Sequence, residues 1–411
     1  MKLISRFSLP VLSAVCLTAQ SASPPSSIFT DIEKMSADLE QITGLHFTKK
    51  VSAAMIGKDQ LRKFLEERID KEIKPADMRA EELTLKMLGL IPQDFDLRAG
   101  TVDLLTEQAA AFYDYHKKKL FVLEGDTGGA QRIALVHELA HALADQNFHL
   151  AKYIKDNGLN DDSATARMAV MEGQATWLMT AYMQKSMGGK AEVSQAVLDV
   201  MRNTVESSVS QYAVFSKAPL YIRESLVFPY TAGILFQDAV YRKLGRDAFG
   251  AVFERPPAST QQVIHPEKYL DQQEPSLPPA PRNPDEKQYR KLAEGTLGEF
   301  DLRALLESVT EKAKAAELAS HLSGSRYLLV ENKTGRNPVL RVISTWDSPE
   351  GARNFFEQYG QAIQTKSKSF APEAAEEGVA AGHDDAGFFR MTLTGKTVES
   401  IEGLQAAPRG R

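Results

Sequence analysis

The amino-acid sequence predicts an α+β fold: a helical N-terminal region, a mixed central domain and a small α/β C-terminal domain. Three observations support this prediction. Apolar residues recur at helical spacing from 28 to about 105, a hairpin pattern at 110–124 precedes two long apolar helices, and strand-like and helix-like segments mix beyond about 296. The 411 residues, 43% of them apolar and 25% charged, suffice for two or three domains.

Residues 1–22 have the pattern of an export signal. A short basic start precedes an apolar run at 7–17, and small and polar residues follow it. This run is too short to span a bilayer as a permanent helix, so we expect cleavage within 19–22, no remaining transmembrane span, and export to the periplasm or the medium. The only cysteine, Cys16, lies in this segment, and Val15 before it disfavours a lipid anchor.

Charge excludes one class of function. The formal net charge is −5, and no block of like charge stands out. A basic patch or stripe is the usual mark of a nucleic-acid-binding protein, so we expect no nucleic-acid partner. The sequence does not determine an oligomeric state.

Residues 23–105 are expected to form helices. Leu61, Leu65 and Ile69 recur at helical spacing among charged residues, and a second helix is expected to end near Gly89. Such a region is either a helical subdomain or a removable prosegment. Both alternatives remain open at this point.

The central domain, expected at 106–275, begins with a β-hairpin. Its two runs, 112–115 and 120–123, flank a polar turn. A helix from about 131 to 147 follows, and because its apolar residues run nearly all round, we expect it to be buried. A polar loop leads to a further helix at about 163–186.

The remaining segments are predicted from spacing and composition. Eight of the chain's 19 prolines lie between 256 and 284, which predicts a boundary without regular structure and a linker at 276–295. The α/β C-terminal domain is expected at 296–411. Helices are expected at 191–207, 230–245 and 349–364, and strands at 327–330, 339–344 and 387–394.

A candidate metal site lies in the first long helix. His137 and His141 are four residues apart, so a helix places both imidazoles on one face, where they can bind one Zn²⁺. Glu138 is rotated by about 100° from His137 and can hold the water that the metal activates. A chance match would put these residues on a solvated helix, which the apolar flanks disfavour.

The candidate third ligand is Glu172. It is the only acidic residue between Asp162 and Glu192, in an otherwise apolar helix. A buried carboxylate is costly unless it is paired or binds a metal. No third histidine has suitable spacing, since His149 lies two turns beyond His141. The alternative is a glutamate that faces solvent.

These residues resemble the gluzincin metallopeptidases, the thermolysin-like clan, and more closely a family of exported peptidase-MA-like zincins. The resemblance covers roughly residues 45 to 300. It is carried by the blocks His137-Glu138-Leu139-Ala140-His141-Ala142-Leu143-Ala144-Asp145-Gln146-Asn147-Phe148 and Glu172-Gly173-Gln174-Ala175, with weaker likeness at 107–114, 228–230 and 259–269.

The resemblance implies a zincin fold and a zinc peptidase in which Glu138 is the general base. It also suggests His265 or Tyr230 as the donor to the oxyanion. Thr176 stands where gluzincins often carry an aspartate that orients the first histidine, so that role is unassigned; Asp145 or a backbone carbonyl is a candidate.

Peptides or proteins are the expected substrates, and the predicted hairpin could pair with an extended peptide. Two other functions remain open. One is a zinc-bearing envelope protein without peptidase activity, and the other is a hydrolase of a non-peptide or cell-wall amide.

Overall fold

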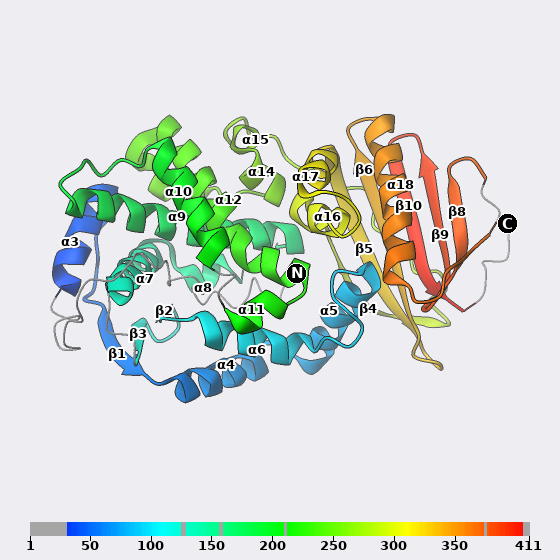
Figure 1. The fold of residues 1–411 in the computed structure, drawn as a ribbon, viewed down its shortest axis with the longest axis horizontal. Coiled ribbons are helices and arrows are strands. Elements are labelled where there is room, and N and C mark those ends of the chain that lie inside the picture. Colours follow the sequence, from blue (N-terminus) through cyan, green and yellow to red (C-terminus); the bar gives the residue numbers. More distant parts are fainter. Residues whose placement is uncertain (1–30, 125–128, 156–158, 209–211, 374–375, 406–411) are drawn as a thin grey trace.

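The structure, a computed structural model, describes residues 31–124, 129–155, 159–208, 212–373 and 376–405. It is an α+β protein, with a helical body at one end and a seven-stranded sheet at the other (Figure 1). The predicted export signal, 1–22, lies outside the described residues. Within them, no helix combines the length and the apolar content that crossing a membrane requires.

The N-terminal region contains a strand that the sequence analysis did not predict. Strand β1 (Ser52–Ile56) pairs in parallel with β3 (Lys119–Leu123), which also pairs with β2 (Ala111–Asp114) in the predicted hairpin. Strand β1 begins with three small residues and has little apolar alternation, so its strand conformation depends on pairing with β3. The other elements are helices: α3 (Ile32–Thr43), α4 (Lys58–Glu72), α5 (Pro75–Leu88) and α6 (Leu97–Gln108).

The central helices form the body around the candidate metal site. Helices α7 (Gly129–Phe148) and α9 (Asp161–Ser186) agree with the predicted long helices, and short α8 (Leu150–Tyr153) lies between them. Helix α9 packs along α12 (Leu220–Leu244). The body also contains α10 (Gln195–Ser208), α11 (Ala213–Lys217) and α13 (Ala248–Glu254), with a single 3₁₀ turn, η2 (Gly245–Asp247), before α13.

Two predictions in this region were wrong. Helix α12 begins at Leu220 rather than near Tyr230, because Pro229 lies inside the helix instead of preceding it. The proline-rich stretch 256–284 was expected to lack regular structure, but it contains α14 (Thr260–Ile264) and α15 (Pro266–Leu270). Pro266 occupies the first turn of α15, where no backbone N–H is needed.

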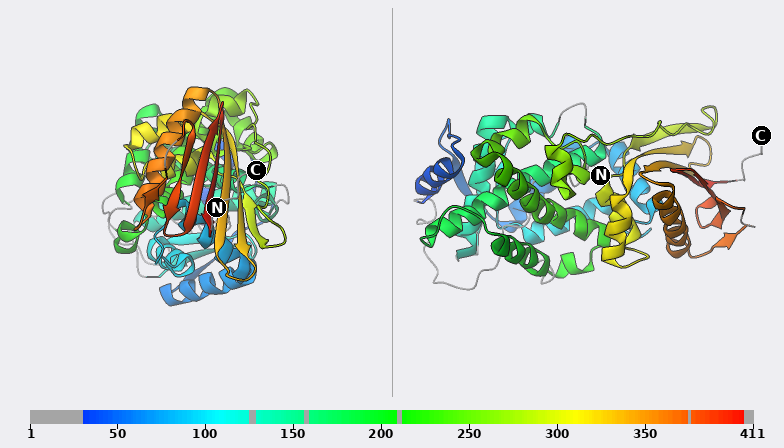
Figure 2. Two further views of the ribbon diagram at one scale, coloured as in Figure 1. Left: turned by 90° about the vertical axis from the view of Figure 1, so that its right-hand side faces the viewer. Right: turned by 90° about the horizontal axis from the view of Figure 1, so that it is seen from above.

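The C-terminal part is a seven-stranded sheet in the order β4-β5-β6-β10-β9-β8-β7, in which all neighbours are antiparallel. Helix α18 (Pro349–Lys366) packs on one face of it, and α16 (Glu299–Leu306) and α17 (Lys312–Ser320) lie between α18 and the helical body (Figure 1, Figure 2). The strands are β4 (Tyr289–Gly295), β5 (Leu322–Asn332), β6 (Pro338–Trp346), β7 (Ala371–Pro372), β8 (Val379–Asp384), β9 (Gly387–Thr394) and β10 (Thr397–Leu404).

This sheet is larger than the three predicted strands. Strand β4 falls at the end of the stretch expected to be a linker, 276–295, and it pairs with β5 at the edge of the sheet. Its side chains are mostly half-buried or exposed, so they lack the apolar alternation that marks a strand in the sequence. Pairing along β5 holds β4 in place.

Candidate metal centre

Helix α7 carries two of the three predicted ligands. His137 and His141 lie one turn apart on this helix, and their side chains are 2% and 5% exposed. Helix α7 packs against α9 on one side and against β2 and β3 on another, so its apolar circumference is buried as predicted. The two imidazoles therefore project into the interior of the helical body.

Helix α9 brings Glu172 to the same point. Its first turn is fixed by a capping box between Asn160 and Ser163. At the centre of the helix, Gly173 faces Gly233 of α12, and a Cβ atom on Gly173 would lie 2.2 Å from the Gly233 carbonyl carbon. Only glycine permits this close crossing. The crossing holds α9 against α12 next to Glu172, the candidate ligand.

The three side chains converge on one point. The Nε2 atoms of His137 and His141 lie 3.1 Å apart, and Oε2 of Glu172 lies 3.1 Å and 3.3 Å from them. A tetrahedral Zn²⁺ with ligand bonds of about 2.0–2.1 Å separates its ligand atoms by about 3.3–3.4 Å. Within the described part of the chain, these residues are the cluster that could hold a metal ion.

A buried carboxylate oxygen supports the same fit. Oε1 of Glu172 is buried and has no hydrogen-bond partner, although the residue is only 1% exposed. An unsatisfied carboxylate oxygen in the interior is costly. A cation bound between Glu172 and the two histidines would compensate this cost.

The protonation states of His137 and Glu172 suit a metal ligand set. Burial lowers the pKa of His137, and the neighbouring His141 lowers it further, so the imidazole is neutral near pH 7. Burial would raise the pKa of Glu172, but His141 and His137 beside it lower that pKa to about 2. Metal binding requires a neutral imidazole and an ionised carboxylate, and both are present.

The Glu138 carboxylate is held by the hairpin. It is fully buried, and its Oε2 accepts a 2.8 Å hydrogen bond from the backbone N–H of Tyr113 in β2. Strand β2 is an outer strand of the order β1-β3-β2, and this N–H points away from β3. Because outward groups alternate along an antiparallel strand, the backbone of Ala111 and the carbonyl of Tyr113 share that outer edge.

The two candidates for oxyanion donor lie in different places. The ring of Tyr230 stacks on that of His137, with centroids 6.0 Å apart. His265 lies between α14 and α15, where its Nε2 is 2.9 Å from Oε1 of Glu299 and its Nδ1 is 3.8 Å from Glu267. Its ring makes no contact with the metal cluster in the described structure. The structure therefore brings Tyr230, but not His265, to the site.

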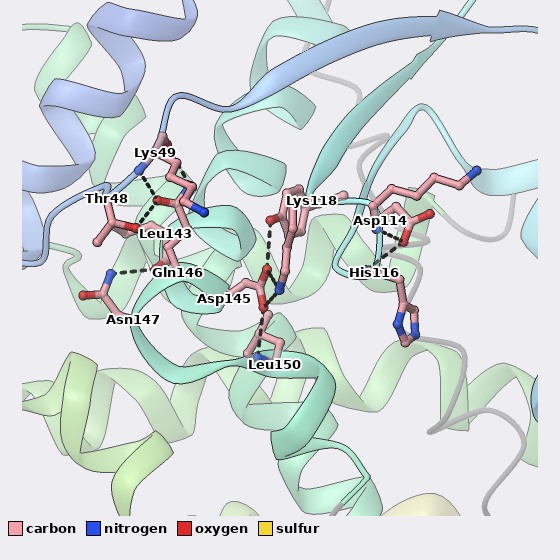
Figure 3. A network of polar contacts seen from close by, with 12 residues as sticks. Thr48, Lys49, Asp114, His116, Lys118, Leu143, Asp145, Gln146, Asn147 and Leu150 are labelled. Atoms are coloured by element: carbon pink, nitrogen blue, oxygen red, sulfur yellow. Dashed lines mark hydrogen bonds and ion pairs between the residues drawn. The ribbon is translucent and has the colours of Figure 1, made fainter.

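The contacts of Asp145 show what this carboxylate does. This buried carboxylate accepts hydrogen bonds from the Tyr113 hydroxyl, the Lys118 ammonium and the backbone N–H of Leu150 (Figure 3). Within the described residues, neither His137 nor His141 is among its partners, so the suggestion that Asp145 orients a ligand histidine was wrong. Asp145 instead ties the hairpin to the end of α7.

Thr176 does not replace the missing acid either. Its hydroxyl donates to the Glu172 carbonyl one turn earlier in α9, at 2.7 Å. Sequence reasoning missed the contributions of Tyr113 and Lys118, because they depend on the hairpin lying across α7. The hydrophobic alternation of the hairpin gives no signal for a backbone N–H directed at Glu138.

Comparisons with known proteins concern the C-terminal part. Residues 287–409 match a family described as a domain of unknown function, DUF8575, which covers less than half of the chain. The match spans β4 to β10 and leaves out α7 and α9. No curated protein matches the chain. No solved structure matches it either. The chain thus carries, at residues 287–409, a domain similar to a family without an assigned function.

Proposed function

We propose that this protein is an exported zinc-dependent peptidase of the gluzincin type, with a zincin-like fold around α7 and α9. The observation that carries the proposal is the triangle of His137, His141 and Glu172 atoms at 3.1–3.3 Å, with the Glu138 carboxylate on the next position of the same helix. The export pattern of residues 1–22 supports the location, and the block from His137 to Phe148 supports the family.

His137, His141 and Glu172 would hold the zinc. When bound, Zn²⁺ supplies a water of lowered pKa and polarises the scissile carbonyl. Glu138 is the general base: it accepts the proton of the attacking water and passes it to the leaving amine. The hydrogen bond from the Tyr113 N–H holds this carboxylate in position.

Tyr230 is the candidate for stabilising the oxyanion, because its ring stacks beside His137 in the same interior space. The outer edge of β2 offers backbone groups next to Glu138 that an extended peptide can pair with. The candidate ligands and base are all less than 5% exposed: His137, Glu138, His141 and Glu172. We therefore expect short or unfolded peptides to be better substrates than folded proteins.

Zinc content tests the site directly. We expect about one zinc per chain in purified residues 23–411, measured by inductively coupled plasma mass spectrometry, and far less in Glu172→Ala, because a structural or catalytic zinc needs at least three protein ligands. Glu357→Ala, at an exposed position of α18, is the control and should keep its zinc.

Peptidase activity is then measured on casein and on short peptides. Hydrolysis that disappears with a chelator and returns with Zn²⁺ supports the proposal. A parent protein without zinc would overturn it, and full zinc in Glu172→Ala would remove Glu172 from the ligand set.

A further inference from the structure

A second candidate binding site lies on another face of α12. It is a cavity of about 620 Å³ between α10, α11, α12, α14, α16 and α17. Val227, Thr231 and Leu235 line it and share one face of α12, because they are four residues apart. Gly233, which faces α9, lies about 200° around the helix from Leu235. The cavity is thus separated from the metal centre by the width of a helix.

The size of this cavity suits a small molecule. Pockets for small ligands typically enclose about 300–1,000 Å³ and have mostly apolar walls. Eight apolar side chains line this one, and five of them belong to the same helix. They are Phe215, Leu220, Val227, Phe228, Ala232, Leu235, Val263 and Ile264. A ligand that fills the cavity must therefore present a sizeable apolar body.

The charged lining is strongly biased toward cations. Four basic side chains line the cavity, Arg202, Arg223, Arg303 and Lys312, against one acidic side chain, Glu224. Glu224 lies 3.5 Å from Arg303 and 3.2 Å from Lys312, so it already has two cationic partners. Positive charge is left over even if the nearby Glu307, whose pKa is raised mainly by burial, is ionised.

Arg223 and Arg202 are the cations that remain available. Within the described residues, neither forms an ion pair, and Nε of Arg223 is buried without a hydrogen-bond partner. A buried donor without an acceptor costs about 1–3 kcal/mol. Guanidinium groups bind carboxylates and phosphates in a bidentate manner, so an anionic group of a ligand would satisfy this donor.

We propose that this cavity binds a small amphipathic anion, with a carboxylate or phosphate head at Arg223 and an apolar chain along α12. The basic side chains of the lining bind the anionic head of the ligand. The apolar side chains of the lining cover the apolar part of the ligand. The enclosed volume is too small for a folded partner or a nucleic acid. This inference does not depend on the metal centre or on peptidase activity.

Binding is tested by isothermal titration calorimetry on residues 23–411, with ligand concentrations below micelle formation. The probes are dodecanoate, dodecyl phosphate, dodecanol and inorganic phosphate. We expect both dodecyl anions to bind, and dodecanol and inorganic phosphate to bind at least about tenfold more weakly, since one charge-assisted contact and the apolar chain are each lost. The stronger of the two anions identifies the head group.

Two variants locate the site. Arg223→Gln should weaken binding of the two dodecyl anions about tenfold and leave the affinity for dodecanol unchanged. Arg353→Gln, on the exposed surface of α18, is the control and should leave all affinities unchanged. Ala232→Trp should fill the cavity and abolish binding of all three dodecyl compounds. Circular dichroism and urea unfolding, measured in parallel, show whether each variant is folded. Because this control does not use zinc, the test stays separate from that of the peptidase.

The proposal is overturned if neither anion binds, if dodecanol binds as well as dodecanoate, or if a folded Ala232→Trp protein binds the anions like the parent. Loss of binding in Ala232→Trp supports the proposal even where Arg223→Gln does not fold.

Discussion

At the scale of single residues, Glu138 is defined by what surrounds it rather than by its motif. Its carboxylate is fully buried one residue after His137, and it accepts the N–H of Tyr113. It thus lies next to the candidate ligands and is held by a backbone group of the hairpin, the position a general base would need. The roles proposed for the three candidate ligands and for Glu138 can therefore be tested by separate substitutions.

We predict that Glu138→Gln keeps its zinc and loses hydrolysis. Glutamine has nearly the same shape and its amide oxygen can still accept the Tyr113 N–H, but it cannot take a proton. Loss of general-base catalysis typically lowers the rate by about 10²–10⁴-fold. Zinc content and kcat on a short peptide, measured on the same sample, check this; a variant with parental kcat would rule out Glu138 as the base.

At the scale of elements, the crossing of α9 and α12 positions Glu172. Gly173 and Gly233 meet there, and a Cβ on Gly233 would lie 2.2 Å from the Ala169 carbonyl oxygen. A backbone atom cannot move aside as the end of a flexible side chain can. The distance between the two helices, and with it the position of Glu172, is set by these two glycines.

We predict that Gly233→Ala lowers the free energy of unfolding by about 1–3 kcal/mol or more and weakens zinc binding, because the two helices must separate. Gly250→Ala in α13 is the matched control: its added Cβ would meet nothing closer than 3.8 Å, so it should be neutral or stabilising by up to about 1 kcal/mol. Urea unfolding and zinc titration of both variants provide the comparison. Equal stabilities would show that the crossing is adaptable.

Strand β1 and helix α3 bear on whether the N-terminal region is removable. Strand β1 supplies one of the two partners of β3, and Met35 and Leu39 of α3 are fully buried. Helix α3 also packs on α7 and α9. These contacts are those of an integral part of the body.

We predict that a protein starting at Lys58, without α3 and β1, is insoluble or binds no zinc, because β3 would be left with an open edge and α7 would lose its cover. Solubility, zinc content and activity are compared with those of residues 23–411. A soluble, zinc-bearing and more active truncated protein would instead identify this region as an inhibitory prosegment.

At the scale of the whole molecule, a buried acidic cluster joins the helical body to the C-terminal domain. Asp162 in the first turn of α9 accepts hydrogen bonds from the backbone N–H and hydroxyl of Thr260, at 2.8 and 2.6 Å. Burial, with smaller contributions from Asp301 and Glu299, raises the pKa of Asp162 to about 7 against the effect of these hydrogen bonds. In the unfolded chain this pKa is about 3.9.

The raised pKa predicts that stability falls as pH rises from about 4 to above 7. Between these values the folded protein holds a proton on Asp162 that the unfolded chain has lost. The stability that this proton confers is therefore fully present below about pH 4 and is lost above about pH 7. Asp162→Asn cannot titrate, and it keeps an acceptor for Thr260. We predict that this variant gains stability relative to the parent on going from pH 4.5 to pH 8, by an amount on the order of a few kcal/mol.

Urea unfolding at pH 4.5, 6 and 8 checks this prediction, with Asp271→Asn at an exposed position as the control. A stability difference between Asp162→Asn and the parent that does not change with pH would contradict it.

The sequence by itself predicted the candidate metal ligands and determined the helices that carry them. The spacing of His137 and His141 is a property of any α-helix, and the isolation of Glu172 in an apolar helix is visible in the chain. Local periodicity likewise predicted α7, α9, the hairpin, α18 and β9. These features depend on residues close together in the sequence, which is why they could be predicted without a structure.

Only the tertiary structure decided how distant segments meet. The Tyr113 N–H reaches Glu138, Lys118 binds Asp145, and His265 turns to Glu299 because of packing between elements that are far apart in the chain. Strands β1 and β4 have little apolar alternation and are held by their partners β3 and β5. Helix α12 continues through Pro229, because its burial against α9 outweighs the loss of one backbone hydrogen bond.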